Sequence, residues 1–357
     1  MNSPIHPGTI LEETMNAYGL SQVELATRIG LSRKQLNMII NEKASISPET
    51  AIRLSRVFEI SSDFWINLES NYQHAIALHD DLKHISDEEQ YLSHFAFYKD
   101  MANFGWVEKT LSRATKVVNL LSFFAVNSLK TVIDRDVAIE FRIADANKAS
   151  IPETQAWLRQ GEIAAFKTLP DTDYNKKLLA SSLDEIRALS QQPITAVYLQ
   201  VKEILKKAGV ILIGLPNIPR SPANGALIWI QNDTPVILIS LRNRTEDIFW
   251  FTLFHEIGHL LIHDKNKNFI DEIAQDDTLT HEIEANDFAR NALIPAAAYE
   301  EFINSGNFSL LSIKSFASTI QIAHSIVAGR LAKESYVQWN FITPLRPRYK
   351  FKITTGI

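Results

Sequence analysis

The sequence contains no cysteine among its 357 residues. Disulfide bridges, thiolate-held zinc or iron–sulfur sites and thiol nucleophiles are therefore excluded, and any metal site must use His, Asp or Glu. The chain also lacks an apolar run of about 18 residues, and residues 1–8 show no basic region followed by an apolar stretch. We therefore expect a cytoplasmic protein that makes no contact with a membrane.

The chain also has no excess of positive charge. Lys and Arg number 36 against 41 Asp and Glu, which gives a net charge of −5 and a pI near 6.1. This balance argues against sequence-independent coating of nucleic acid, so any contact with DNA must be local. At roughly 150 residues per domain, the length predicts two or three domains.

Helix start signals follow one another closely over residues 8–72. Ser21 to Glu24 and Ser32 to Gln35 are both capping boxes, in which a serine and a side chain three residues later bond to each other's backbone. Gly30, between them, permits the left-handed turn that ends a helix. With further starts at Ser47 and Ser61, the pattern predicts a five-helix domain that contains a helix-turn-helix.

The chain beyond residue 78 mixes helical patterns with a few β-rich runs. An acidic stretch at residues 79–89 resembles a linker, and a strand is expected at residues 137–143. After a helix at 194–208, runs at 210–213, 226–230 and 236–240 predict a small sheet. Helices at 245–263 and 280–293 follow. The expected fold class is mainly α with a small β-sheet (α+β).

The strongest chemical signal is the pattern HExxH at His255, Glu256 and His259, inside one of these predicted helices. Residues four apart on a helix lie on nearly one face, about 6 Å apart along the axis, which is the spacing two imidazoles need to bind one zinc ion. Glu256 is turned aside and remains available as a general base. The alternative is a pair of core histidines satisfied by their surroundings.

Residues 281–286 and His263 supply the remaining candidates. Glu282 is the expected third ligand, and Asn286, one turn later on the same face, would hydrogen-bond the outer nitrogen of a ligand histidine. Glu284 is turned about 200° away and is interpreted as a surface charge held in reserve. His263 is assigned to packing or substrate contact. His281 is a weak candidate for stabilising an oxyanion, the alternative being an exposed histidine.

Three protein ligands leave a fourth position for water, which is typical of catalytic zinc. Manganese and cobalt suit the same set of ligands. The chemistry indicated is peptide-bond hydrolysis, with Glu256 moving protons. We expect the strand at residues 236–240 to bind an extended substrate by β-addition.

The second predicted helix of the helix-turn-helix carries side chains suited to reading DNA. Arginine can donate two hydrogen bonds to guanine. Glutamine and asparagine can pair with adenine, and lysine contacts phosphate groups. The candidates are Ser32, Arg33, Lys34, Gln35, Asn37 and Asn41. Residues 1–74 hold six basic against eight acidic residues, so the domain charge does not support DNA binding, and a protein-docking module is the alternative.

Residues 251–263 together with 282–295 resemble the ImmA/IrrE family of metallopeptidases. The resemblance implies zinc-dependent cleavage of helix-turn-helix repressors, with His255, His259 and Glu282 as metal ligands and Glu256 as the catalytic glutamate. Where members of the family carry Asp at the position of Asn286, this chain has the amide, which polarises its partner less.

Residues 6–13, 19–26, 37–54 and 63–68 resemble HigA-type antitoxins of the XRE group. That resemblance implies operator binding as a homodimer and a cognate toxin.

From these features we predict a helix-turn-helix domain at 1–74, a helical middle region at 75–190, an ImmA/IrrE-like zincin domain at 191–300 and a C-terminal helical segment and tail at 301–357. The predicted function is a DNA-binding, antitoxin-like transcriptional regulator whose zinc endopeptidase cleaves a regulatory protein, either an XRE-type repressor or another copy of this chain. One alternative is an antitoxin or repressor with a catalytically unused metal site. Another is a peptidase whose helix-turn-helix docks protein substrates.

Overall fold

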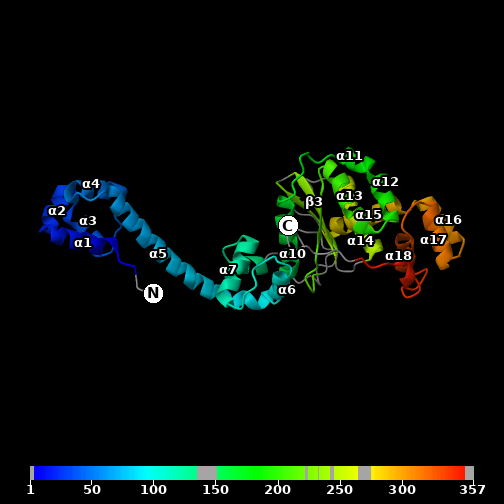
Figure 1. Ribbon diagram of the computed structural model, residues 1–357, viewed down its shortest axis with the longest axis horizontal. Coiled ribbons are helices and arrows are strands. Elements are labelled where there is room, and N and C mark those ends of the chain that lie inside the picture. The colour runs from blue at the N-terminus through cyan, green and yellow to red at the C-terminus, as the bar shows by residue number, and fades with distance from the viewer. Residues whose placement is uncertain are drawn as a thin grey trace. The chain divides into compact units, whose positions relative to one another are not determined.

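The computed structural model describes residues 4–134, 151–221, 224–231, 233–241, 245–263 and 275–349. The chain divides into two compact units, Met1–Gln90 and Tyr91–Ile357 (Figure 1). The strand expected at residues 137–143 lies outside the described residues. The finer division into four regions stays a prediction.

The first unit is built from helices. They are α1 (Pro7–Ala17), α2 (Gln22–Ile29), α3 (Arg33–Ile40), α4 (Pro48–Phe58) and α5 (Ser62–Glu88). Both capping boxes are present at the starts of α2 and α3, and Gly30 takes the left-handed conformation with φ 64°. The unit encloses its own apolar core, in which Leu25, Leu36 and Trp65 are fully buried. The prediction of five helices with a helix-turn-helix is confirmed.

The helix α5 is longer than the sequence pattern indicated. It runs through the boundary placed after residue 74 and through the acidic stretch that we interpreted as a linker. No glycine or proline interrupts the sequence from Ser62 to Glu88, so nothing in the chain stops the helix earlier. The division between the two units falls just after its end, at Gln90.

The second unit is also mainly helical and contains one small sheet, as predicted. Its described elements after η1 (Glu89–Phe95) are α6 (Tyr98–Asn103), α7 (Arg113–Phe124), α8 (Leu129–Asp134), α10 (Ile151–Phe166), α11 (Lys176–Ser181), α12 (Leu183–Ala188), η3 (Leu189–Gln191), α13 (Ile194–Lys207), β1 (Ile211–Leu215), β2 (Gly225–Ile230), β3 (Thr234–Ser240), α14 (Glu246–Ile262), α15 (Gln275–Leu293), α16 (Ala296–Asn304), α17 (Leu310–Thr319), α18 (His324–Lys333) and η5 (Thr343–Leu345).

The three strands form a mixed sheet in the order β1-β3-β2. β3 pairs in parallel with β1 and antiparallel with β2. Helix α10 packs closely against β3. A Cβ added at Gly161 of this helix would lie only 2.4 Å from the side chain of Leu238. Ile237 and Ile239 belong to the core cluster that includes α14. Burial on both faces explains the unbroken apolar run of β3.

The position of β3 overturns one expectation. We expected residues 236–240 to bind an extended substrate by β-addition, and this prediction is wrong. Both sides of β3 are already hydrogen-bonded, one to β1 and the other to β2. A strand can accept a further strand only along an unpaired side.

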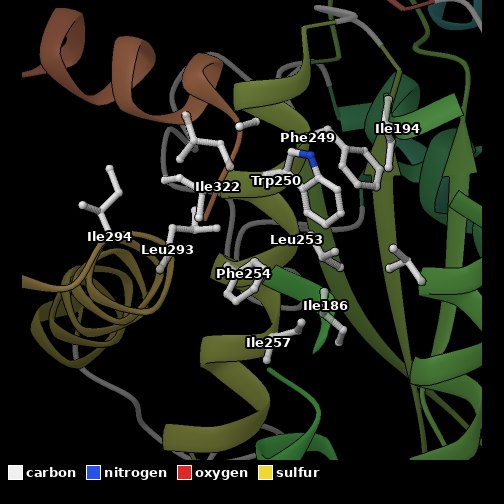
Figure 2. Close-up of a cluster of buried hydrophobic side chains, with 14 of the residues drawn as sticks. Ile186, Ile194, Phe249, Trp250, Leu253, Phe254, Ile257, Leu293, Ile294 and Ile322 are labelled. Carbon is white, nitrogen blue, oxygen red and sulfur yellow. The ribbon is translucent and has the colours of Figure 1, made fainter. Parts of the chain in front are cut away.

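Helix α14 passes through the middle of the core. Figure 2 shows Phe249, Trp250, Leu253, Phe254 and Ile257 along it, with isoleucines and leucines from neighbouring elements around them. All five are at most 1% exposed. Because apolar side chains pack against neighbouring elements on several faces of α14, this helix, which carries the HExxH residues, has a fixed position in the core.

No single helix in the described ranges is long and apolar enough to cross a membrane. The helices α17 and α18 reach that length and hydropathy only when taken together across a bend of 120°.

A buried ion pair fixes the start of α14. Arg346 donates from Nε to Asp247 Oδ2 at 2.9 Å, and its Nη2 lies 2.8 Å from the same oxygen. The side chain of Asp247 is 7% exposed. We expect Arg346→Ala to lower the free energy of unfolding by about 3 kcal/mol, because a buried carboxylate is left without its partner. Urea unfolding of the full chain measures the loss.

The control is the exposed pair Lys130 and Asp134, whose side chains are both 62% exposed. Lys130→Ala should cost less than about 1 kcal/mol, since water screens the pair. Equal losses for the two variants would contradict a structural role for the Arg346 contact.

Candidate metal centre and nucleic-acid interface

The three predicted metal ligands come together between α14 and α15. His255 and His259 project from α14, and their Nε2 atoms lie 3.1 Å apart. Glu282, from α15, places Oε2 3.3 Å from His255 Nε2 and Oε1 3.2 Å from His259 Nε2. Each residue thus turns one ligand atom toward a common point.

These distances fit a tetrahedral ion. Ligand atoms about 2.0–2.1 Å from a tetrahedral zinc ion lie about 3.3 Å from one another. The two imidazole nitrogens are 3.1 Å apart, and they lie 3.3 and 3.2 Å from the Oε2 and Oε1 atoms of Glu282, respectively. Two imidazole nitrogens and one carboxylate also form a donor set that zinc accepts in catalytic sites. The residues present therefore fit a divalent metal ion.

The close crossing of α14 and α15 depends on Gly258. A Cβ at this position would meet Phe288 Cδ1 at 3.0 Å and the backbone of Ala285 at 3.4 Å. The glycine inside HExxH thus lets α15 approach the face of α14 beside the two histidines. Ala285, itself fully buried, is the small residue on the facing helix.

Glu282 and His255 each favour the charged form of the other. Burial disfavours the charged form of Glu282, but hydrogen bonds from His255 and His259 outweigh it and lower the pKa of the carboxyl to about 2. Burial alone would lower the pKa of His255. The hydrogen bond to Glu282, with the charges of Glu256 and Glu282, raises it instead.

The lowered pKa of Glu282 makes the stability of the folded protein depend on pH. Because the folded-state pKa lies below the usual 4.5, the ionised carboxylate stabilises the folded state fully above pH 4.5. This stabilisation is lost as the pH falls toward 2.

Glu256 lies against the start of β2. Its side chain is buried, and a Cβ at Gly225 would lie 2.5 Å from Glu256 Oε1 and 2.4 Å from Thr252 Cγ2. Only glycine leaves room for this carboxylate beside the strand. Sequence reasoning missed Gly225, because no spacing pattern connects it with a residue 31 positions later.

Asn286 lies close enough to His255 to contribute to its raised pKa. However, the buried Nδ1 of His255 has no hydrogen-bond partner of ordinary geometry among the described residues. The structure therefore brings Asn286 to the predicted neighbourhood, while its role in orienting His255 stays a prediction.

His263 and Glu284 form a contact that the helical pattern did not indicate. Helix α14 ends at Ile262, and His263 follows in an extended conformation. His263 Nδ1 lies 3.1 Å from His259 Nδ1, and its Nε2 lies 3.0 Å from Glu284 Oε2. Glu284, interpreted as a reserve surface charge, is 48% exposed and bonded to His263. His281 packs against His263 with 4.1 Å between ring centroids.

The predicted DNA-reading residues lie at and along α3. Leu36, Ile39 and Ile40 are buried in the core of the first unit. The six candidates are exposed on the opposite side of the helix, namely Ser32, Arg33, Lys34, Gln35, Asn37 and Asn41.

Three of the six side chains, those of Ser32, Gln35 and Asn41, form hydrogen bonds within or at the ends of α3. Ser32 Oγ donates to Gln35 Oε1 at 2.9 Å and accepts from the backbone N–H of Gln35 at 3.2 Å. Asn41 donates from Nδ2 to the carbonyl of Asn37 at 2.8 Å. The side chains of Arg33, Lys34 and Asn37 are the remaining ones that extend from the surface.

Two family models match this chain. The model "Helix-turn-helix" matches residues 11–65, and the model "IrrE N-terminal-like domain" matches residues 217–323. The first covers α2 and α3, and the second covers β2, β3 and the helices with the candidate metal ligands.

Several known proteins are similar to about a fifth of this chain. Virulence-associated protein I of Dichelobacter nodosus is 38% identical over 77 residues, which is 21% of this chain and 71% of that protein. Virulence-associated protein A of the same organism is 35% identical over 74 residues, 20% of this chain and 72% of that protein. A solved structure, the Pseudomonas aeruginosa antitoxin HigA with the higBA promoter, is 41% identical, covers 22% of this chain and 88% of that chain, and has a TM-score of 0.22.

The protein is a DNA-binding regulator of the helix-turn-helix class. It belongs to the helix-turn-helix family through residues 11–65, and residues 217–323 in addition match the IrrE N-terminal-like domain. Both resemblances drawn from the sequence are confirmed.

The proximity of Glu282 to His255 can be tested in the metal-free protein. Glu282→Gln removes the charge that raises the pKa of His255, while the burial that lowers it remains. We expect the pKa of His255 to fall, because burial then acts without the opposing carboxylate. NMR titration of the imidazole signals in chelator-treated protein measures the shift.

Glu284→Gln is the matched control, because this carboxylate contacts His263 and not His255. It should leave the pKa of His255 nearly unchanged. An unchanged value in Glu282→Gln would show that Glu282 does not reach His255 in solution.

Proposed function

We propose that this chain binds operator DNA through α3 and hydrolyses peptide bonds at the site of His255, His259 and Glu282. The observation that carries the peptidase assignment is the convergence of these three residues. The two Nε2 atoms lie 3.1 Å apart, and each lies within 3.3 Å of one carboxylate oxygen of Glu282. The buried carboxylate of Glu256, the next residue after His255, completes the constellation.

The residues divide the chemistry among them. A zinc ion held by His255, His259 and Glu282, or manganese or cobalt in its place, would supply Lewis acidity toward water and the scissile carbonyl. Glu256 takes a proton from the attacking water and delivers it to the leaving amine. The charge of Glu256 already acts on His255, so the base stands within electrostatic range of the site.

The substrate is proposed to be an extended polypeptide. β2 is one of the two edge strands of the described sheet, and Gly225 at its start leaves the space that the Glu256 carboxylate occupies. A peptide lying beside β2 would run past the catalytic carboxylate, with backbone hydrogen bonds that are independent of its sequence. This replaces β3, which we had expected in that role.

A regulatory protein with a helix-turn-helix is the proposed substrate, either an XRE-type repressor or another copy of this chain. The support is that a helix-turn-helix unit and an IrrE-like domain occur in one sequence. A cognate toxin partner and a homodimer remain predictions drawn from the HigA resemblance.

A second candidate is a repressor whose IrrE-like domain binds metal without hydrolysis. The observation that favours it is His255 Nδ1, which is buried without a hydrogen-bond partner in the described part of the chain. Metal-binding histidines in enzymes are ordinarily oriented by a partner at that nitrogen.

For DNA recognition, we propose that Arg33 and Asn37 read base edges in the major groove and Lys34 contacts phosphate. Ser32, Gln35 and Asn41 position the helix through the bonds already described.

Glu256→Gln separates the two candidates. The purified full-length protein is loaded with zinc and incubated with a helix-turn-helix repressor, or alone at high concentration. We expect the rate of fragment formation to fall by about 100- to 10,000-fold, because the group that moves the proton is lost. Zinc content should stay the same, since the three ligands are intact.

Glu301→Gln, an exposed glutamate on α16, is the control and should cleave like the wild type. Fragments of equal amount from wild type and Glu256→Gln would end the peptidase proposal. Zinc binding with no fragments from any form would support the second candidate.

Arg33→Ala tests the DNA-reading helix. Loss of a two-pronged contact with a guanine should weaken operator binding by about 5- to 150-fold and relax the preference at that base pair. Lys34→Ala should instead weaken binding to all sequences and reduce the salt dependence by about one charge. Fluorescence anisotropy over a range of salt concentrations measures both effects.

Arg56→Ala on α4 is the matched control, an exposed arginine of the same unit that is not on α3. If it weakens binding as much as Arg33→Ala, α3 is not the reading helix.

A further inference from the structure

A second group of two histidines and a carboxylate lies beside the first. It consists of His263, His281 and Glu284, and one possible ligand atom from each residue lies within 4.8 Å of the others. His263 stands at the end of α14, whereas His281 and Glu284 both belong to α15. None of the three is needed to hold an ion at the site of Glu282.

The contacts inside this group are short. His263 Nε2 lies 3.0 Å from Glu284 Oε2, and the rings of His263 and His281 are 4.1 Å apart at an angle of 38°. The side chain of His263 is only 5% exposed, while that of Glu284 is 48% exposed. A buried imidazole is therefore joined to a carboxylate that an ion from solution can reach.

We propose that His263, His281 and Glu284 form a second site for a divalent cation, with zinc as the cation that this donor set suits best. The ion would replace the hydrogen-bonding proton between His263 Nε2 and Glu284. It would bridge α14 and α15 at the end of α14, beyond the first site.

The second site is connected to the first through one hydrogen bond. His259 Nδ1 and His263 Nδ1 lie 3.1 Å apart. A neutral imidazole that binds a metal through Nε2 carries its hydrogen on Nδ1. If both rings bound ions in this way, two N–H groups would face each other across that distance, and neither could accept.

The two sites therefore oppose each other. When His259 holds an ion through Nε2, its Nδ1–H donates to His263 Nδ1, and the hydrogen of His263 stays on Nε2 and donates to Glu284. A second ion must displace that hydrogen and break the bond between the two rings. Occupation of one site therefore weakens the binding of an ion at the other.

Metal titration of the full-length, chelator-treated protein tests this. Zinc binding is followed by calorimetry, and cobalt binding by visible absorption. We expect the wild type to bind two equivalents, the second roughly tenfold or more weakly than the first. His281→Ala and Glu284→Gln should each lose the second equivalent and keep the first. Two variants are used so that a folding defect in one cannot decide the outcome.

His255→Ala should no longer bind zinc at the first site. It should bind zinc at the second site more tightly than the wild type does, because the hydrogen between the imidazoles of His259 and His263 is then free to move to His263. His74→Ala, an exposed histidine of α5, should bind like the wild type.

A wild type that binds only one equivalent, or a second equivalent that survives both His281→Ala and Glu284→Gln, would overturn the second site. Unchanged affinity in His255→Ala would overturn the opposition between the sites. These results leave the first site and its peptidase assignment intact. Those depend instead on the first equivalent and on Glu256→Gln.

Discussion

The contact between α14 and α15 at Gly258 is the constraint on which the candidate metal centre depends. His255 and His259 share one helix and need only helical geometry to face the same way. Glu282 comes from another helix, and it reaches them because α15 crosses where α14 has no side chain. A glycine within a helix costs about 1 kcal/mol relative to alanine. Close packing against Ala285 offsets this cost.

The rest of the second unit holds α14 in place for that crossing. The helix is enclosed by apolar side chains, and the sheet beside it is itself covered by α10. The same arrangement brings the start of β2 against Glu256. The candidate ligands, Glu256 and the adjoining strand thus come from three segments that the core keeps in register, as the proposed hydrolysis requires.

Much of this was predictable from the sequence, because the signals were local. The spacing of His255 and His259 and the capping boxes at Ser21 and Ser32 depend on helical period and backbone donors alone. What could not be predicted depends on contacts distant in sequence. Strand order decided that β3 is central, which no apolar run reveals. The end of α14 at Ile262 turned His263 toward Glu284.

The structure therefore joins a DNA-binding regulator to a domain with the donor set of a metallopeptidase. The most direct test of this account is a crystal structure of the zinc-soaked protein with anomalous data at the zinc absorption edge. The account predicts a peak about 2.0–2.1 Å from His255 Nε2, His259 Nε2 and a carboxylate oxygen of Glu282. No peak between these residues, or Glu282 turned away from the two histidines, would contradict it.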